Sequence, residues 1–271
     1  MTVDGQLSYA YAVLRPSPEL EGTALAGIRG VADAPVGLVR SGAVAAAVSA
    51  VPGEDFSEAA LKVRLEDLRW LEPTARAHHA VIEALAAHTT VLPLRLATVY
   101  LDEGRVREML GEQEPAFTAL LDRLADQVEW GVKVYAEVPP GAVATPVDPS
   151  AEETDPGRAY LRRRRHQREA REDAWRAAEE AVRRTEARAR GLAVERARHR
   201  PQQGDLARQA GENVANDAYL VPRRLSEEFR DRMLHAADGL PGVRVDVTGP
   251  WAPYSFAMPP APEGQEGVRP R

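Results

Sequence analysis

Alternating apolar and polar positions predict strands in the first part of the chain. Residues 7–14 alternate in this way until Pro16 ends the run. Two further runs, 36–40 and 43–51, are separated by a Ser-Gly pair at 41–42, which suits a tight turn. We therefore expect one strand followed by a β-hairpin.

A continuous apolar stripe predicts a long helix that begins after Ser57. Ser57 is a good N-cap, because its hydroxyl can accept a hydrogen bond from a backbone N–H of the first turn. Pro73 should kink the helix or divide it near Glu72, because proline lacks the N–H that a helix uses. The stripe repeats at spacings of three and four and consists of Leu61, Leu65, Leu68, Leu71, Ala75, His78, Ile82 and Leu85.

The pattern continues as strand, helix and strand. Residues 91–101 predict a strand that is apolar on both faces except at Arg95 and Thr98. Residues 104–127 predict a helix, and the alternation over 131–138 predicts another strand.

Proline and charge mark the middle of the chain. Five prolines within 139–157 predict a linker between a first domain of residues 1–138 and a second domain of residues 158–258. An arginine-rich helix should follow over about 158–198. The tail, 259–271, is rich in proline, glycine and charge, and we expect it to be mobile.

The long charged helix has a thin apolar seam, so it should either project into solvent or pack closely through alanines against one partner helix. The seam consists of Ala170, Ala174, Ala178, Ala181 and Leu192. Pairs of Glu and Arg at i,i+4 should support the helix. These pairs are Glu172–Arg176, Glu179–Arg183, Glu180–Arg184 and Glu186–Arg190.

The last part of the chain again predicts strand, helix and strand, over 218–221, 226–237 and 242–248. The closing strands of the two halves share a Gly-Val-Lys/Arg-Val pattern at 131–134 and 242–245. This echo fits two related α+β domains, although four residues of common types can also match by chance. We expect an α+β protein with two domains.

Composition narrows the class of protein. The chain has 271 residues, 44% of them hydrophobic, which suits a globular protein of two domains. It has no cysteine, which excludes a disulfide scaffold, a thiolate zinc site, an iron–sulfur cluster and a cysteine nucleophile. The apolar run at 42–51 is too short for the ~20 residues that a membrane helix needs. We therefore expect neither a membrane span nor a targeting segment.

Catalytic patterns are absent from the sequence. There is neither a phosphate-binding glycine loop nor a serine nucleophile elbow. Glu72, His79 and Glu83 share one helix face and could form a weak surface metal site, although a solvated charged face is the simpler interpretation. His78 falls on the apolar stripe, where we expect a hydrogen-bonded core residue. We expect no enzyme, no cofactor and no small-molecule substrate.

Positive charge is concentrated in one segment. The whole chain has a net charge of -6, but residues 158–200 hold 15 arginines and 7 acidic residues, a local charge of +8. The run at 162–168 could bind nucleic acid or anionic lipid. It lacks interleaved aromatic residues for base stacking, so pairing with acidic residues of this chain or of a protein partner is favoured. We expect neither nucleic acid nor a membrane as partner.

Three segments of distinctive composition follow one another along the chain. They are 91–100 (Val-Leu-Pro-Leu-Arg-Leu-Ala-Thr-Val-Tyr), 216–221 (Asn-Asp-Ala-Tyr-Leu-Val) and 249–256 (Gly-Pro-Trp-Ala-Pro-Tyr-Ser-Phe). They resemble the L-P-L-R-F-G-T-V-F, A-[YF]-L-V and G-P-W-P-P-Y-S-F motifs of the gas vesicle GvpL/GvpF family, in family order. Ala97 stands where glycine is usual, and Ala252 stands where proline is usual.

The resemblance implies a non-enzymatic accessory protein that acts in the cytoplasm in the assembly of gas vesicles, which are hollow, gas-filled protein shells. It implies as partners the small hydrophobic shell protein and other gas vesicle accessory proteins, and as fold two α+β domains, the second ferredoxin-like. It does not say whether the chain is of the F or the L type. The residues expected to contact a partner are Leu94, Arg95, Thr98, Tyr219, Pro250, Trp251, Pro253, Tyr254 and Phe256.

Each candidate also has a purely structural interpretation. An apolar shell subunit could be shielded by strand addition at 91–101 or 242–248, or by a groove that accepts a helix. The aromatic residues of the C-terminal motif could anchor a partner or fill a corner of the domain core. Arg95 could face a partner or pair with a local carboxylate.

Two functions of other classes stay open. An α+β protein of this size could bind a small ligand or act as an enzyme without a recognisable motif. The run at 162–168 could instead serve an adaptor for nucleic acid or for a membrane surface.

Overall fold

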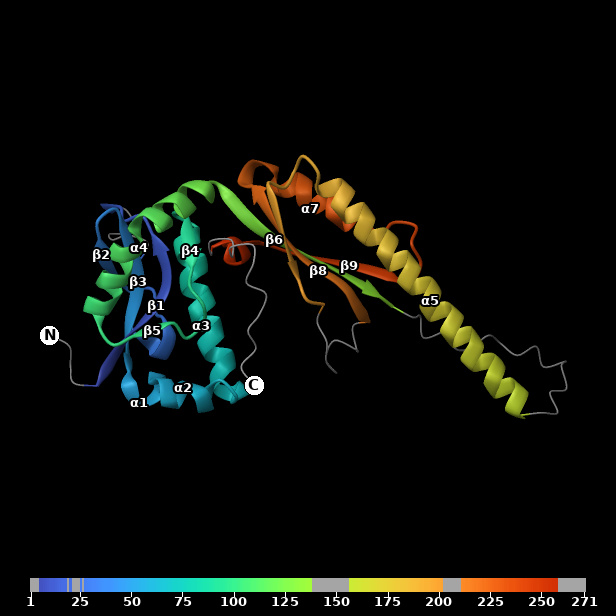
Figure 1. Ribbon diagram of the computed structural model, residues 1–271, viewed down its shortest axis with the longest axis horizontal. Coiled ribbons are helices and arrows are strands. Elements are labelled where there is room, and N and C mark those ends of the chain that lie inside the picture. Colours follow the sequence, from blue (N-terminus) through green and yellow to red (C-terminus); the bar gives the residue numbers. More distant parts are fainter. Residues whose placement is uncertain are drawn as a thin grey trace. The chain divides into compact units, whose positions relative to one another are not determined.

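The computed structural model describes residues 5–18, 20, 25, 27–137, 156–201 and 211–257. It divides the chain into two compact units, which Figure 1 shows with their elements labelled. Unit 1 is Met1–Gln127 together with Trp251–Arg271, and unit 2 is Val128–Pro250. This division differs from the expected segments, because the C-terminal motif returns to unit 1. The expected tail and the expected linker before Pro156 lie outside the described residues.

Unit 1 is built on a sheet with the strand order β2-β3-β1-β4, and β5 also pairs with β1. The strands are β1 (Gln6–Leu14), β2 (Gly37–Ser41), β3 (Val44–Pro52), β4 (Val91–Pro93) and β5 (Val99–Tyr100). The structure confirms the first strand and the hairpin. Gly42 takes a φ of 56° in the hairpin turn, where a glycine is favoured, and the Ala43 N–H donates to Glu114 Oε1 at 2.8 Å.

The helices of unit 1 are α1 (Gly53–Phe56), α2 (Glu58–Arg64), α3 (Leu68–Ala86) and α4 (Glu103–Arg123). Ser57 caps α2 as expected, since its hydroxyl accepts a hydrogen bond from the Ala60 N–H. The predicted division at Pro73 is wrong, because α2 and α3 separate at Asp67. The Asp67 side chain accepts from the Arg69 N–H and starts α3, and Pro73 lies inside that helix.

The prediction of one continuous strand over 91–101 is also wrong. β4 ends at Pro93, and a turn of five residues leads to the two-residue β5. Ala97, within this turn, takes a φ of 62°, a left-handed conformation that a strand does not allow. The turn is therefore a distinct element, and it carries Leu94, Arg95 and Thr98.

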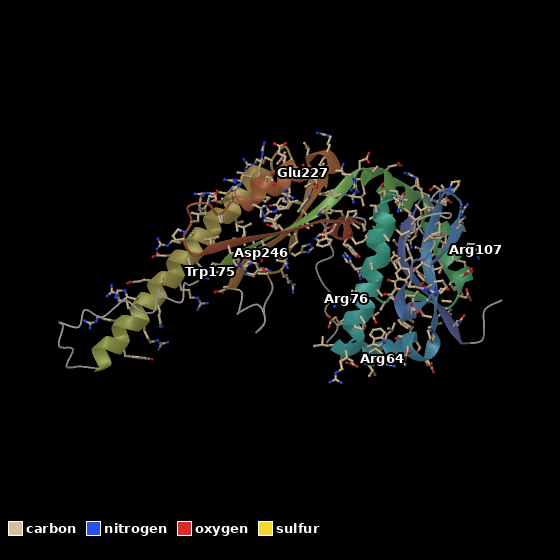
Figure 2. The ribbon with its side chains drawn as sticks, turned by 180° about the vertical axis from the view of Figure 1, so that it is seen from behind. Arg64, Arg76, Arg107, Trp175, Glu227 and Asp246 are labelled. Carbon is tan, nitrogen blue, oxygen red and sulfur yellow. The ribbon has the colours of Figure 1, made fainter. Side chains whose placement is uncertain are left out.

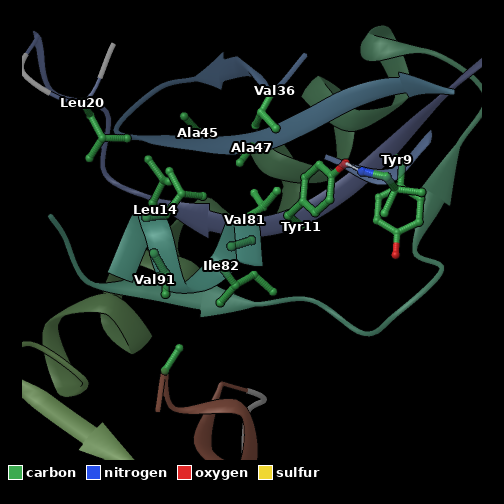
Figure 3. Close-up of a cluster of buried hydrophobic side chains, with 14 of the residues drawn as sticks. Tyr9, Tyr11, Leu14, Leu20, Val36, Ala45, Ala47, Val81, Ile82 and Val91 are labelled. Atoms are coloured by element: carbon green, nitrogen blue, oxygen red, sulfur yellow. Dashed lines mark hydrogen bonds between the residues drawn. The ribbon is translucent and has the colours of Figure 1, made fainter. Parts of the chain in front are cut away.

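The core of unit 1 lies between its sheet and α3. Figure 3 shows Tyr9 and Tyr11 of β1 among aliphatic side chains, including Val81 and Ile82 of α3. Each of these four residues is completely buried. Ala252 from the C-terminal motif belongs to the same cluster, so the end of the chain completes the N-terminal core.

Unit 2 is a four-stranded sheet with the strand order β7-β8-β6-β9. Its elements follow one another as β6 (Gln127–Ala136), α5 (Pro156–Ala189), β7 (Glu195–His199), β8 (Glu212–Pro222), α7 (Ser226–Leu234) and β9 (Val243–Trp251). The two echoing segments, 131–134 and 242–245, lie in or beside β6 and β9, which are neighbours in this sheet. They do not close two separate sheets, as a duplication of whole domains would require.

The charged helix is shorter than expected. α5 ends at Ala189, and part of the predicted helix forms β7 instead, which pairs with β8. Ala174, Ala178 and Ala181 are buried and pack with Val134 and Ala136 of β6. The alanines thus form a close contact over this half of the helix, but their partner is a sheet and not the expected helix.

The ion pairs of α5 differ in part from the predicted set. Glu180 pairs with Arg184 at 3.0 Å, as expected. Glu172 pairs with Arg168 rather than Arg176, and Glu186 pairs with Arg196 of β7. Within the described ranges, no helix combines the length and the apolar composition needed to cross a bilayer.

Candidate functional site

Two neighbouring histidines of α3 each contact one of the distinctive segments named above, 91–100 and 249–256. His78 binds the turn after β4, and His79 binds the C-terminal motif. Side chains of adjacent helix residues point about 100° apart, so one helix can hold two separate segments in this way. This arrangement forms the candidate site.

A chain of hydrogen bonds fixes His78. The Ala97 N–H donates to the Tyr9 hydroxyl at 3.0 Å, and that hydroxyl lies 3.0 Å from His78 Nδ1. Since the hydroxyl accepts from Ala97, its own proton points to Nδ1. His78 Nε2 then carries the ring proton and donates to the Leu94 carbonyl at 3.2 Å. Every polar atom of the cluster has a partner.

Burial keeps both side chains of this cluster uncharged. His78 is 4% exposed, and desolvation lowers the pKa of its imidazole to about 4. Burial likewise raises the pKa of the Tyr9 hydroxyl. The expectation of a hydrogen-bonded core histidine at His78 is confirmed.

The turn held by His78 exposes one cation. The Leu94 N–H donates to the Tyr11 carbonyl at 2.8 Å, and the Thr98 hydroxyl donates to the Arg95 carbonyl at 2.7 Å. These bonds fix the backbone, whereas the Arg95 side chain is exposed. Arg95 makes no ion pair with any residue in the part of the chain that the structure describes. The local carboxylate considered for Arg95 is therefore not found there.

The C-terminal motif packs on α3 and α4 with one side and faces solvent with the other. Phe256 is 2% exposed, and its carbonyl accepts a hydrogen bond from Arg123 Nη2 at 2.7 Å. The Tyr254 hydroxyl lies 3.3 Å from His79 Nδ1, and the Trp251 ring meets the His79 ring at 5.4 Å. Trp251 remains 38% exposed.

The two interpretations of this motif therefore apply to different residues. Phe256, Ala252 and Pro253 are buried and fill the corner of the core. Trp251 is exposed and Tyr254 is partly buried, so both stay accessible to a partner.

Tyr219 does not belong to an accessible site. It is 1% exposed in unit 2, its ring lies 5.3 Å from that of Phe229, and burial raises its pKa to about 12. The Arg196 guanidinium lies 5.7 Å from the Tyr219 ring centroid and pairs with Asp217 at 2.8 Å. The sequence-based assignment of Tyr219 to partner contact is corrected, because this side chain forms part of the core. Pro250, the last residue of unit 2, is exposed.

The metal site considered on α3 is not formed. Glu72 pairs with Arg76, and His79 Nε2 lies 3.8 Å from Glu83 Oε1. The described residues contain no group of three or more His, Asp or Glu side chains that could hold a metal ion.

Several residues that shape the site carry no sign of that role in the sequence. The pattern marks Tyr9 only as a strand residue and Arg123 only as a helix residue. The left-handed backbone at Ala97 had a visible sign, because the family motif has glycine at that position. The hydrogen bond from Arg123 to the Phe256 carbonyl joins residues 133 positions apart, and no local pattern marks it.

Comparison with known proteins identifies relatives over nearly the whole chain. A family model described as gas vesicle synthesis protein GvpL/GvpF matches residues 7–258. The chain is 46% identical over 253 residues to gas vesicle protein L of Streptomyces sp. (strain CB03234), and the match covers 93% of each chain. It is 32% identical over 126 residues to gas vesicle protein F of the same organism, covering 46% of this chain and 47% of that one.

Two solved structures share the fold. The crystal structure of gas vesicle protein GvpF from Microcystis aeruginosa superposes with a TM-score of 0.62 at 19% identity, covering 93% of this chain and 99% of that one. The crystal structure of GvpF from Anabaena sp. PCC7120 gives a TM-score of 0.65 at 18% identity, covering 93% and 96%.

Proposed function

This chain belongs to the GvpL/GvpF family of gas vesicle synthesis proteins, and we propose that it is a non-enzymatic accessory protein of gas vesicle assembly. The match of the family model to residues 7–258 carries this proposal. The relatives are named as gas vesicle proteins rather than as enzymes. The long match to a protein L, compared with the half-length match to a protein F, supports an L-type chain.

The proposed partners are the gas vesicle shell protein and other gas vesicle accessory proteins, met in the cytoplasm. Arg95 and Trp251 are the motif residues best placed to contact them in unit 1, because both are exposed. His78 of α3 holds the Leu94 carbonyl next to Arg95, and the ring of His79, also of α3, meets the Trp251 ring. An exposed arginine and a partly exposed tryptophan suit recognition, since Trp and Arg often dominate binding energy at interfaces.

We also propose that unit 2 has a ferredoxin-like fold. Its elements follow the order strand, helix, strand, strand, helix, strand, from β6 to β9. The first and third strands of this series, β6 and β8, are neighbours at the centre of the sheet, and the second and fourth strands are at the edges. That placement supports the proposal.

Deleting the gene in a host that forms gas vesicles tests the function. We expect vesicles to be absent or deformed, and the wild-type gene supplied in trans to restore them. A host that still makes vesicles of normal number and shape without this protein would contradict the proposal. The matching deletion of a gene outside the gas vesicle cluster is the control.

A further inference from the structure

The first four turns of α5 form an exposed arm, defined here as residues 156–170. Every described side chain from Tyr160 to Glu169 is exposed, including the apolar Tyr160 at 54% and Leu161 at 66%. In Figure 1, α5 continues past the strands of its own unit in this region, and Figure 2 shows its side chains with no neighbouring element. The side chains described in the arm are thus not packed against another helix or strand in the part of the chain that the structure describes.

The buried part of the apolar seam follows the arm along the helix, and the first seam residue, Ala170, is the half-buried last residue of the arm. From Ala174 onward the seam is buried against β6. On either side of Ala174, Arg171 and Trp175 both hydrogen-bond the Glu212 carboxylate of β8, at 2.8 and 3.0 Å. One turn further toward the start, the seam position is Gln167, which is exposed. A helix face without apolar seam residues gains little from an apolar partner.

Charge is the dominant property of this part of the helix. Residues 156–171 hold seven arginines and one glutamate, a net charge of +6. Arg165 pairs with Glu169 at 2.9 Å and Arg168 pairs with Glu172 at 2.8 Å, and all four side chains are at least half exposed. Exposed pairs along one helix are weak, so incoming carboxylates can replace them.

We propose that the arm docks an acidic segment of another protein, with Asp or Glu side chains at helical spacing. Arg164 and Arg168 are one turn apart, so carboxylates that repeat every three or four residues can meet successive guanidinium groups. Guanidinium groups bind carboxylates through two parallel hydrogen bonds, which adds geometric specificity. Tyr160 and Leu161 offer apolar contact at the start of the arm. The inference is separate from the proposed function, because the chain could support assembly without using the arm.

A second copy of this chain fits the arm less well. Two arms would bring two strongly positive helices together. Some acidic residues of unit 1 already pair within the chain, since Glu58 pairs with Lys62, Glu103 with Arg107 and Asp122 with Arg15. These carboxylates would have to leave partners of their own chain.

Nucleic acid also fits less well. Base stacking needs free aromatic faces, and the Arg164 guanidinium lies 5.9 Å from the centroid of the Tyr160 ring. The chain as a whole carries a net charge of -6, which repels a polyanion from the rest of the surface.

Substituting arginines of the arm should change binding without lowering the stability of the fold. Arg164 and Arg168, at i,i+4, carry like charges on neighbouring turns, which opposes helix formation. Replacing Arg164 by glutamate relieves this repulsion. Replacing Arg165 by glutamate as well exchanges its pair with Glu169 for a repulsion of similar size, so the two changes offset each other. Reversing both charges should therefore leave the stability of the protein nearly unchanged while removing the binding site.

Binding of a synthetic acidic helical peptide to the full-length protein tests the proposal. The peptide carries Glu at i,i+4 positions, and a scrambled peptide of the same composition is its control. The Arg164→Glu/Arg165→Glu variant should bind the peptide about tenfold more weakly at ~0.15 M salt without a fall in Tm. The Arg176→Glu/Arg183→Glu variant changes the net charge by the same amount, but in the half of α5 that packs on β6. It should bind the peptide like the wild type.

Four results would overturn the proposal. They are no binding of the acidic peptide, equal binding of the scrambled peptide, equal losses in the two double variants, and tighter binding of a DNA duplex or anionic lipid vesicles at the same salt. If the charge-reversed arm variant lowers Tm, Arg164→Gln/Arg165→Gln replaces it. Unchanged peptide affinity in that variant would contradict the proposal equally.

Discussion

The polar side chains around His78 in unit 1 and those along the arm of unit 2 differ in burial and in bonding. Around His78, each polar atom is buried and has a partner within the chain. Along the arm, Arg165 and Arg168 are exposed, and they pair with Glu169 and Glu172 of their own helix. The first arrangement stabilises the fold, and the second leaves groups available for recognition.

The same contrast occurs within the C-terminal motif. Phe256 and Ala252 are buried in unit 1, while Trp251 remains accessible beside His79. Some residues of this one motif therefore stabilise the core, and others lie on the surface. Substitutions at buried positions should change stability, and substitutions at exposed positions should change binding.

The largest effect should come from Phe256→Ala. Removing a completely buried aromatic ring leaves a cavity and should lower the free energy of unfolding by about 3–5 kcal/mol. Trp251→Ala, at a partly exposed position, should cost less than about 1.5 kcal/mol. Urea unfolding of both variants measures the difference. Equal losses would show that the motif does not divide into buried and accessible parts.

The second effect is a loss of stability in acid. The folded pKa of His78 is about 4 and its ordinary value is 6.5, so the unfolded chain binds more protons between these values. Stability from the neutral imidazole is complete above about pH 6.5 and falls, by up to about 3 kcal/mol, as the pH drops toward 4. The difference between wild type and His78→Gln in urea unfolding isolates this term. A pH-independent difference would place His78 in a less buried environment.

Tyr9→Phe should have an intermediate effect. The variant keeps the ring but leaves the Ala97 N–H and His78 Nδ1 without their shared partner, at a cost of about 1–3 kcal/mol. Tyr100→Phe is the control, because the Tyr100 hydroxyl has no hydrogen bond within the described residues. Thermal unfolding compares the two. A neutral Tyr9→Phe variant would mean that the hydrogen-bond chain does not stabilise the turn.

Ala97→Gly should stabilise the protein. The left-handed φ of 62° is strained for alanine and free for glycine, which should gain up to about 1 kcal/mol. Ala59→Gly, on the exposed face of helix α2, should instead lose about 1 kcal/mol. The sign of the change in Tm distinguishes the two, and a loss in both variants would contradict the strained conformation.

The smallest effect on stability is expected in the arm. Arg164→Gln/Arg165→Gln should change the free energy of unfolding by less than about 0.5 kcal/mol, because both side chains are exposed. Ala178→Leu, in the half of the same helix that packs on β6, should lower the free energy of unfolding by about 1–3 kcal/mol, because the larger side chain overpacks the core. Denaturant unfolding of both variants tests the boundary between the two halves of α5. A large loss in the arm variant would show that the arm is packed.

Local patterns predicted the elements whose side chains alternate or repeat clearly. The first strand, the hairpin, the Ser57 cap and the buried His78 followed from periodicity and capping chemistry. The same patterns did not predict strand β7 in place of the last part of the expected helix. Arg196 and Arg198 continue the charged pattern of that helix, so they looked like its exposed surface. In the structure, strand pairing with β8 and the partly buried pair of Arg196 with Asp217 decide the conformation there.

Contacts between distant segments explain the other differences. The turn at Ala97 depends on Tyr9, and the buried position of Phe256 depends on helices some 130 residues or more earlier in the chain. Such contacts leave no periodic pattern in either segment. The family motifs pointed to the right segments, but only the packing separated the accessible Arg95 and Trp251 from the buried Tyr219.

Capture of the gas vesicle shell protein by the purified full-length chain tests the account most directly. The Arg95→Ala/Trp251→Ala variant should fold with a nearly unchanged Tm and retain about tenfold less shell protein than the wild type. Arg69→Ala, which removes another exposed arginine of unit 1, should capture as much as the wild type. Equal capture by all three proteins would contradict the claim that the exposed residues of the motifs recognise the shell.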